Sequence, residues 1–262
     1  AVYMLYRIYV NIFDLEDRWN WLIIAIMVVS MLIGAFAGLA ENSIRRVLGY
    51  QMINGMPFIL VMLAFTSDDP QRALAAGLLY TLHHMITVGA LILTSGAIEE
   101  TYATGLLSKL SGLARRDPLV AALFAAGAFS IVGFPPFSGM WGKILLVFEI
   151  ARAVDWWAWL VIAVIVIASI GALLSMLRVW REVFWGKPMQ RYPKELRVSG
   201  RLIAPSAVLM VGSLAMFIFA GPLIDATLTA TEGLLDVDGY AHAVLGEDPI
   251  GVPDMTDLQG GR

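Results

Sequence analysis

The chain contains no cysteine and few charged residues, and both shortages limit what the protein can be. Without cysteine it has no disulfide and no thiolate metal or redox centre. Only 15% of its 262 residues are charged and 59% are hydrophobic, whereas soluble domains carry about a quarter charged residues. The sequence also lacks a phosphate-binding glycine loop, a nucleophile elbow and a His, Asp and Glu metal spacing. We therefore expect an integral membrane protein with no cofactor and no bound metal.

Six apolar segments are long enough to cross a bilayer, which takes about 20 residues each. The predicted spans are residues 19–40, 46–65, 71–98, 118–151, 156–184 and 202–228. Residues 1–13 have helical character but are too short to cross, so we interpret them as the end of a helix that begins upstream. The predicted fold class is an all-α polytopic membrane protein with six full spans and a partial one.

Basic residues fall on alternate loops between the predicted spans. Of the 18 lysines and arginines, two lie at positions 45 and 46, three between 109 and 116, and seven between 178 and 201. The other loops carry acidic residues such as Asp68 and Asp155, and so does the C-terminal segment 229–262. By the positive-inside rule the basic loops, including 185–201, are cytoplasmic. We expect 229–262 to be an acidic, poorly ordered extracytoplasmic tail, and we expect no nucleic-acid binding.

The fourth span is interrupted by the motif G-F-P-P-F-S-G-M-W-G-K, residues 133–143. Its prolines and glycines predict a broken helix, because proline blocks the helix before it and glycine permits unusual dihedrals. Broken spans whose freed carbonyls line a cavity mark ion pathways in transporters. The helix-break and pathway candidates are Gly133, Pro135, Pro136, Ser138 and Gly139. A simple proline kink is the alternative for the prolines alone.

Lys143 follows this break, near the predicted middle of the membrane. A lysine at that depth is costly and normally faces a protein interior or a hydrated cavity, although it can also snorkel from a helix end. His83 and His84 fall in the middle third of the third span and suit a proton relay, or else are hydrogen-bonded packing residues. Because adjacent helical positions point about 100° apart, we expect only one of them to face a pathway. Glu149 is a possible proton exit group, or a solvated residue at the end of the span.

Several stretches resemble the antiporter-like subunits shared by Mrp-type cation/proton antiporters and the proton-pumping NADH:quinone oxidoreductase, complex I. AFSIVGFPPFSGMWGKILLVFE resembles the broken helix 12 of that family, and its G-x-P-P-x-S-G-x-x-G-K form is most like the MrpD type. Four more stretches are similar to helices 8 to 13: AVYMLYRIYVNIF, ENSIRRVLGYQMINGMPF, LYTLHHMITVGALIL and RVWREVFWGKP. The resemblance assigns residues 1–13 to the end of helix 8, 14–184 to the second inverted repeat of five helices, and 202–228 to helix 14.

The resemblance implies a proton-translocating subunit of a multisubunit Na+/H+ antiporter, in a bacterial cytoplasmic membrane and with other Mrp subunits as partners. Lys143 matches the family's helix 12 lysine and His83 its helix 11 histidine. Val88 stands where many relatives carry a lysine, so we expect a relay that is shorter or water-filled there. Two alternatives remain: a proton-pumping subunit of complex I, and a membrane scaffold without transport.

Overall fold

The computed structural model describes residues 2–12, 17–187, 189–193 and 195–245. Within these ranges the chain is almost entirely helical and has no β-strand, which confirms the predicted fold class. The helices are α1 (Val2–Ile12), α2 (Asn20–Ala37), α3 (Ile44–Leu60), α4 (Pro70–Tyr102), α5 (Leu113–Arg116), α6 (Pro118–Val132), α7 (Gly139–Arg152), α8 (Trp156–Val179), α9 (Gly200–Ile218), α10 (Ala220–Leu235) and α11 (Val237–Leu245).

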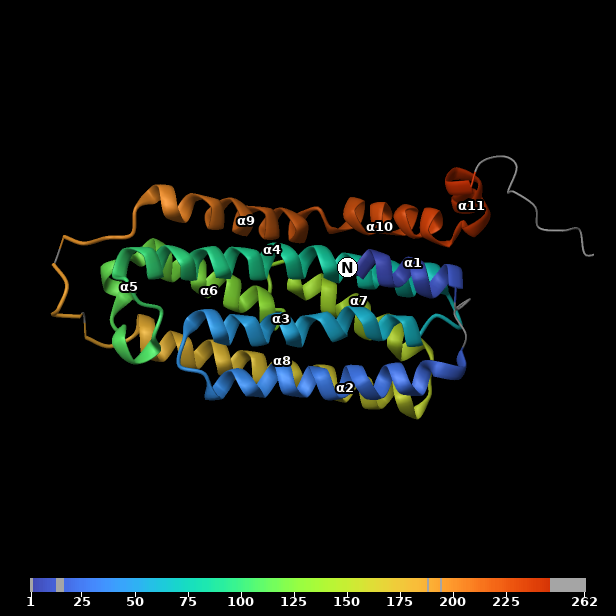
Figure 1. The fold of residues 1–262 in the computed structure, drawn as a ribbon, viewed down its shortest axis with the longest axis horizontal. Coiled ribbons are helices and arrows are strands. Elements are labelled where there is room, and N and C mark those ends of the chain that lie inside the picture. The colour runs from blue at the N-terminus through green and yellow to red at the C-terminus, as the bar shows by residue number, and fades with distance from the viewer. Residues whose placement is uncertain (1, 13–16, 188, 194, 246–262) are drawn as a thin grey trace, which may run out of the picture.

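Five helical segments in the described part of the chain are long and apolar enough to cross a membrane. They contain α2, α3, α4, α8 and α9, and three of them are lengthened by short 3-10 or π turns. The remaining predicted span, the fourth at residues 118–151, is divided between α6, a shorter apolar helix, and α7. Figure 1 shows these helices lying along one axis, with α9 and α10 following one another end to end beside α4.

Helix α4 is the centre of the bundle, since it packs against α3, α6, α7, α9 and α10. Its start is fixed by Asp69, whose carboxylate accepts the Arg72 N–H at 3.1 Å, and by Pro70 in the first turn. Two apolar clusters lie along it: Tyr80 belongs to one and Val88 to the other. The polar residues between these two positions therefore lie in a layer between two apolar cores.

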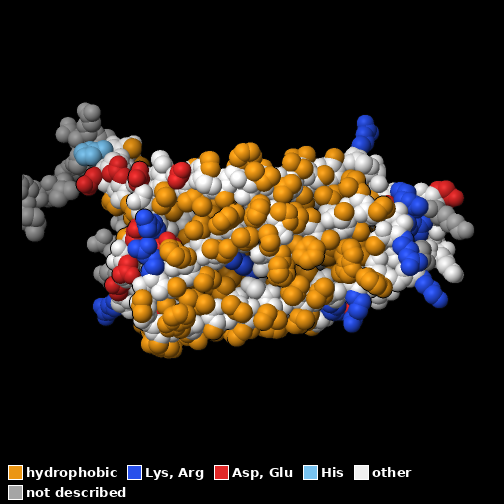
Figure 2. Space-filling model, turned by 180° about the vertical axis from the view of Figure 1, so that it is seen from behind, with side chains coloured by type: hydrophobic (Ala, Val, Ile, Leu, Met, Phe, Trp, Pro, Cys, Tyr) orange, Lys and Arg blue, Asp and Glu red, His pale blue; other side chains and the backbone are white. Residues whose placement is uncertain are grey.

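The charged loops gather at opposite ends of the molecule. The loops at the basic end are joined by backbone hydrogen bonds, from Ile44 N–H to the Gly105 carbonyl at 3.0 Å and from Gly112 N–H to the Trp185 carbonyl at 2.9 Å. Figure 2 shows a broad apolar belt between an end rich in Lys and Arg and an end where Asp and Glu gather. This is the arrangement that a membrane-spanning bundle requires.

The C-terminal region differs from the prediction, because part of the expected tail 229–262 is helical. Helix α9 ends at Ile218, α10 continues to Leu235, and α11 follows. Arg7 of α1 fixes the end of α10 by donating to the Leu234 carbonyl at 2.7 Å and the Gly233 carbonyl at 3.0 Å. These carbonyls have no partner within the helix, so the arginine completes its C-terminus. Residues 246–262 lie outside the described residues.

Candidate functional site

The helix break lies where the motif predicts it. Helix α6 ends at Val132 and is followed by Gly133, which has φ of 101°, and α7 begins at Gly139. A positive φ is inexpensive only for glycine. At Gly139 a Cβ would lie 1.8 Å from the Ser130 carbonyl oxygen, so the two half-helices approach one another more closely than any side chain allows. The break thus brings the end of α6 against the start of α7.

Lys143 extends from α7 back to this break. Its ammonium donates to the Val132 carbonyl, freed at the end of α6, at 2.9 Å and to Ser169 Oγ on α8 at 2.7 Å. Neither acceptor is charged, and the ion pairs among the described residues do not include Lys143. Both acceptors are half-buried and lie beside the helix break, away from the charged ends of the bundle, so the lysine does not snorkel to a membrane surface.

A groove of 590 Å³ opens beside Lys143 between α6, α7 and α8. Apart from Lys143 and Ser169 its walls are apolar, with Phe134, Ile144 and Phe148 among them. An ammonium has three N–H donors, and two of those on Lys143 have acceptors in this chain. The third is available to water or to a neighbouring group.

His83 belongs to a buried cluster of hydroxyl groups. Its Nδ1 lies 2.8 Å from Ser138 Oγ in the break and 3.3 Å from Thr87 Oγ1 on its own helix. Thr87 contacts Ser130 Oγ of α6 at 2.9 Å, and Ser213 of α9 contacts both serines. Sequence reasoning selected His83 and Ser138 but missed the other three. Thr87 could have been found from its position one turn after His83, whereas nothing in the sequence indicates Ser213.

His84 points to a different neighbour, as adjacent helical positions should. Its ring lies over Gly55 of α3, where a Cβ would come within 1.9 Å of His84 Cε1. Among the described residues the Nε2 atom has no hydrogen-bond partner, and neither has the side-chain amide of Gln51 or the Oδ1 of Asn54. Buried polar groups are normally satisfied by protein or by ordered water. The polar side of α3 near His84 is therefore suited to hold water.

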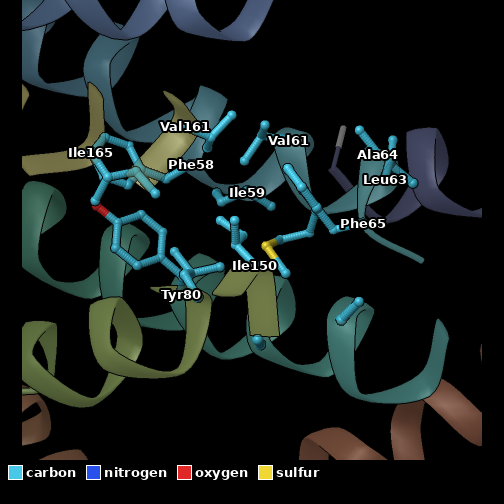
Figure 3. Packing of buried hydrophobic residues seen from close by; sticks show 14 of the residues in the cluster. Phe58, Ile59, Val61, Leu63, Ala64, Phe65, Tyr80, Ile150, Val161 and Ile165 are labelled. Carbon is cyan, nitrogen blue, oxygen red and sulfur yellow. The ribbon is translucent and has the colours of Figure 1, made fainter. Parts of the chain in front are cut away.

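Two aromatic rings connect the histidines with Lys143. Tyr80 lies 5.2 Å from His83 and 6.1 Å from His84 between ring centroids, and 5.3 Å from Phe58 of α3. The Lys143 ammonium lies 5.4 Å from the centre of the Phe58 ring, a cation–π contact. Figure 3 shows Phe58 and Tyr80 facing one another, with Ile165 of α8 nearby. Lys143 and His83 share this core without sharing a hydrogen bond.

Glu149 and Val88 lie apart from this cluster. The Glu149 carboxylate is 3.6 Å from Arg152 and lines a cavity of 420 Å³ at the acidic end, together with Asp68 and Asp69. It follows Lys143 by six residues, about 9 Å of helix rise. Val88 is buried in the second apolar cluster. That Val88 makes the proton relay on α4 shorter or water-filled remains a prediction.

The sequence and the fold match known membrane subunits. The family described as "NADH:quinone oxidoreductase/Mrp antiporter, TM" matches residues 1–171. The D component of the Na(+)/H(+) antiporter of Alkalihalophilus pseudofirmus is 26% identical over 94% of this chain and 49% of its own length. The N component of the NADH-quinone oxidoreductase of Rhizorhabdus wittichii is 33% identical over 82% of this chain and 44% of its own.

A solved structure agrees with these relatives. A chain of the Mrp complex from Dietzia sp. DQ12-45-1b superposes with a TM-score of 0.85 at 33% identity, covering 94% of this chain and 53% of that one. The present chain thus spans about half the length of the relatives that it matches.

Proposed function

The chain belongs to the transmembrane family shared by NADH:quinone oxidoreductase and Mrp antiporter subunits, and from this premise we propose that it moves protons in a Na+/H+ antiporter. It is a multi-pass membrane component of a secondary transporter rather than an enzyme. Its proposed partners are the other subunits of an Mrp complex. Its proposed orientation has the basic loops facing the cytoplasm and the C-terminus, after α10, on the extracytoplasmic side.

The observation that supports proton transfer most strongly is the ammonium of Lys143 bound only by neutral oxygens. A charged lysine in the membrane is costly unless it is paired with an opposite charge. The Val132 carbonyl and Ser169 Oγ also accept an N–H from a neutral amine, so both protonation states keep their contacts. We therefore assign Lys143 the role of a group that alternately takes up and releases a proton.

His83 is the second proposed carrier. Its Nδ1 is held by Ser138 and Thr87, while Nε2 has no partner in the part of the chain that the structure describes and is available to accept a proton from water. In this proposal, water bridges the gap between His83 Nε2 and the Lys143 ammonium, past Tyr80. His84 and the side-chain amides of α3 hold this water from the α3 side. Glu149 is the proposed exit towards the cavity at the acidic end. The exchanged sodium ion binds elsewhere, because an ammonium repels it.

A second candidate is a proton-pumping subunit of NADH:quinone oxidoreductase, supported by the Rhizorhabdus wittichii relative at 33% identity. The same residues would then transfer protons, with quinone reduction as the source of energy. Co-purification separates the two candidates. Small Mrp subunits accompany the chain in the first case, and peripheral iron–sulfur subunits in the second.

The test uses everted vesicles that contain the full-length protein in its complex, in a host without its own antiporters. A pH gradient is imposed, Na+ is added, and collapse of the gradient is followed with a fluorescent amine. We expect Na+-dependent collapse that is absent from vesicles without the complex. If Na+ has no effect while NADH drives acidification of the same vesicles, the antiporter assignment is wrong and the second candidate is correct.

A further inference from the structure

Ser213 of α9 reaches the helix break from a part of the chain that the family match does not include. The match ends at residue 171, and α9 begins at Gly200. The Ser213 side chain is fully buried. Its Oγ lies 2.8 Å from Ser138 Oγ and 3.1 Å from Ser130 Oγ, and it accepts the Ser138 N–H at 3.4 Å. One hydroxyl on the last span thus contacts both sides of the break.

These contacts close a ring of hydrogen-bonding groups. Its members are His83 Nδ1, Ser138, Ser213, Ser130 and Thr87, in that order, and consecutive members are separated by 2.8 to 3.3 Å. The members come from α4, the break, α9 and α6. Ser213 is the only one contributed by α9, so without it the ring is open between Ser138 and Ser130.

The direction of the ring depends on the proton at Nδ1. A serine hydroxyl donates one hydrogen bond and accepts up to two, whereas an imidazole nitrogen either donates or accepts. When Nδ1 carries a proton it donates to Ser138, and donation continues through Ser213 and Ser130 to Thr87. When Nδ1 has a lone pair, Ser138 donates to it and the sequence reverses. Ser213 takes part in both arrangements.

We propose that Ser213 is a positioning residue for His83, acting through Ser138. It holds the Ser138 hydroxyl against Nδ1 and thereby directs the unpartnered Nε2 towards the proton path. The proposal rests on the proposed function, because it assigns Ser213 to the proton transfer that His83 carries out. It also makes α9 part of the site rather than a peripheral span.

Ser206 provides a matched control on the same helix. It is also fully buried, contacts Thr94 Oγ1 of α4 at 2.6 Å and donates to the Ala90 carbonyl at 2.9 Å, but it does not belong to the ring. Ser213→Ala and Ser206→Ala remove the same atom from the same helix. A general loss of packing would affect both variants, and a specific loss at His83 only the first.

The first measurement is amide hydrogen exchange of the purified full-length complex, which does not depend on transport. We expect the segment 134–142 to exchange faster in Ser213→Ala than in Ser206→Ala or wild type, because the Ser138 N–H loses its acceptor. Equal exchange in both variants would show that Ser213 does not hold the break, and would overturn the proposal whatever the complex transports.

The second measurement is the pH profile of proton transfer, driven by Na+ or, in a complex that does not exchange Na+, by NADH. The titratable groups facing His83 are His84 and Tyr80 on α4 and Lys143 on α7, while α6 and α9 present hydroxyls. We expect Ser213→Ala to slow transfer about five-fold, the effect of one neutral hydrogen bond, and to displace the pH profile.

Ser213→Thr should restore rate and profile because it keeps a hydroxyl, whereas Ser213→Val, with a side chain of the same shape as threonine, should not. If the Thr and Val variants behave alike, the effect comes from packing and the positioning role is excluded. A Ser213→Ala rate and profile equal to those of Ser206→Ala would overturn the proposal while leaving the proposed function intact.

Discussion

At the scale of single residues, the site depends on the neutral partners of Lys143. A carboxylate at hydrogen-bonding distance would favour the ammonium form and oppose release of its proton. The structure instead provides a carbonyl and a hydroxyl, each of which serves the charged and the neutral amine. The sequence predicted the lysine and the break beside it. It could not predict Ser169, because that contact joins residues 26 positions apart through the packing of α7 against α8.

Removal of Ser169 Oγ tests this arrangement. We expect Ser169→Ala to slow Na+-dependent proton exchange by roughly ten-fold or more, since a hydrogen bond to a charged group contributes about 1.5–3 kcal/mol. The measurement is the initial rate in everted vesicles matched for complex content. Ser175→Ala is the control, because Ser175 lies on the same helix but donates to the Ala35 carbonyl. Equal rates in the two variants would exclude Ser169 as a functional partner of Lys143.

Gly55 and Gly49 on α3 give a second residue-scale prediction. Gly55→Ala places a methyl group 1.9 Å from the buried His84 ring, whereas nothing lies within 4 Å of a Cβ at Gly49. We expect Gly55→Ala to destabilise the protein by about 1–3 kcal/mol through overpacking, and Gly49→Ala to be neutral or stabilising through helix propensity. Thermal loss of the assembled complex, followed by fluorescence-detected gel filtration, measures both. A Gly55→Ala complex as stable as wild type would contradict the close approach.

At the scale of helices, the broken span is the feature that sequence describes best. Two prolines and three glycines within residues 133–143 are a strong local signal, and the break falls inside them. The end of the last span had no such signal. The sequence predicted an end at residue 228, but α10, which is held by α1 and α4, continues to Leu235. The difference arises because tertiary contacts can stabilise a helix whose sequence gives no strong signal of its own.

The contact between α1 and α10 predicts a local effect of removing Arg7. No local pattern in the sequence indicates a partner for Arg7, since its acceptors lie 226 and 227 positions away. We expect Arg7→Gln to increase amide exchange in residues 231–245 of the purified complex, because the last carbonyls of α10 lose a charged donor. Arg18→Gln is the control, since Arg18 lies over the ring of Trp19, away from α10. Unchanged exchange in α10 and α11 would contradict the capping role.

At the scale of the whole molecule, the distribution of charge and apolar surface predicts one orientation in the membrane. The alternation of basic and acidic loops could be read from the sequence because it is a property of composition along the chain. The link from His83 through Ser138 to Ser213 of α9 could not be read from the sequence, because it depends on which helices become neighbours. Local sequence signals therefore predicted the spans and the break, whereas the ring of hydrogen-bonding groups around His83 could be recognised only in the packed bundle.

The absence of cysteine from this chain makes its orientation testable. In a full-length protein freed of any other cysteine, Lys187→Cys and Asp68→Cys introduce single thiols at exposed positions of opposite ends. We expect a membrane-impermeant maleimide to label Asp68→Cys in intact cells and Lys187→Cys only in everted vesicles. The reverse pattern would place the basic loops outside and invert the proposed direction of proton movement.

The central claim is that Lys143 transfers protons, and one comparison tests it most directly. Na+-dependent collapse of a pH gradient is measured for wild type, Lys143→Ala, Lys143→Arg and, as a control, Lys109→Ala at an exposed position of the basic end. Arginine keeps the charge but does not release its proton. The account predicts that both Lys143 variants assemble and lose exchange while the control retains it. Exchange that persists in assembled Lys143→Arg would show that only a fixed charge is needed there, and would contradict proton transfer by this lysine.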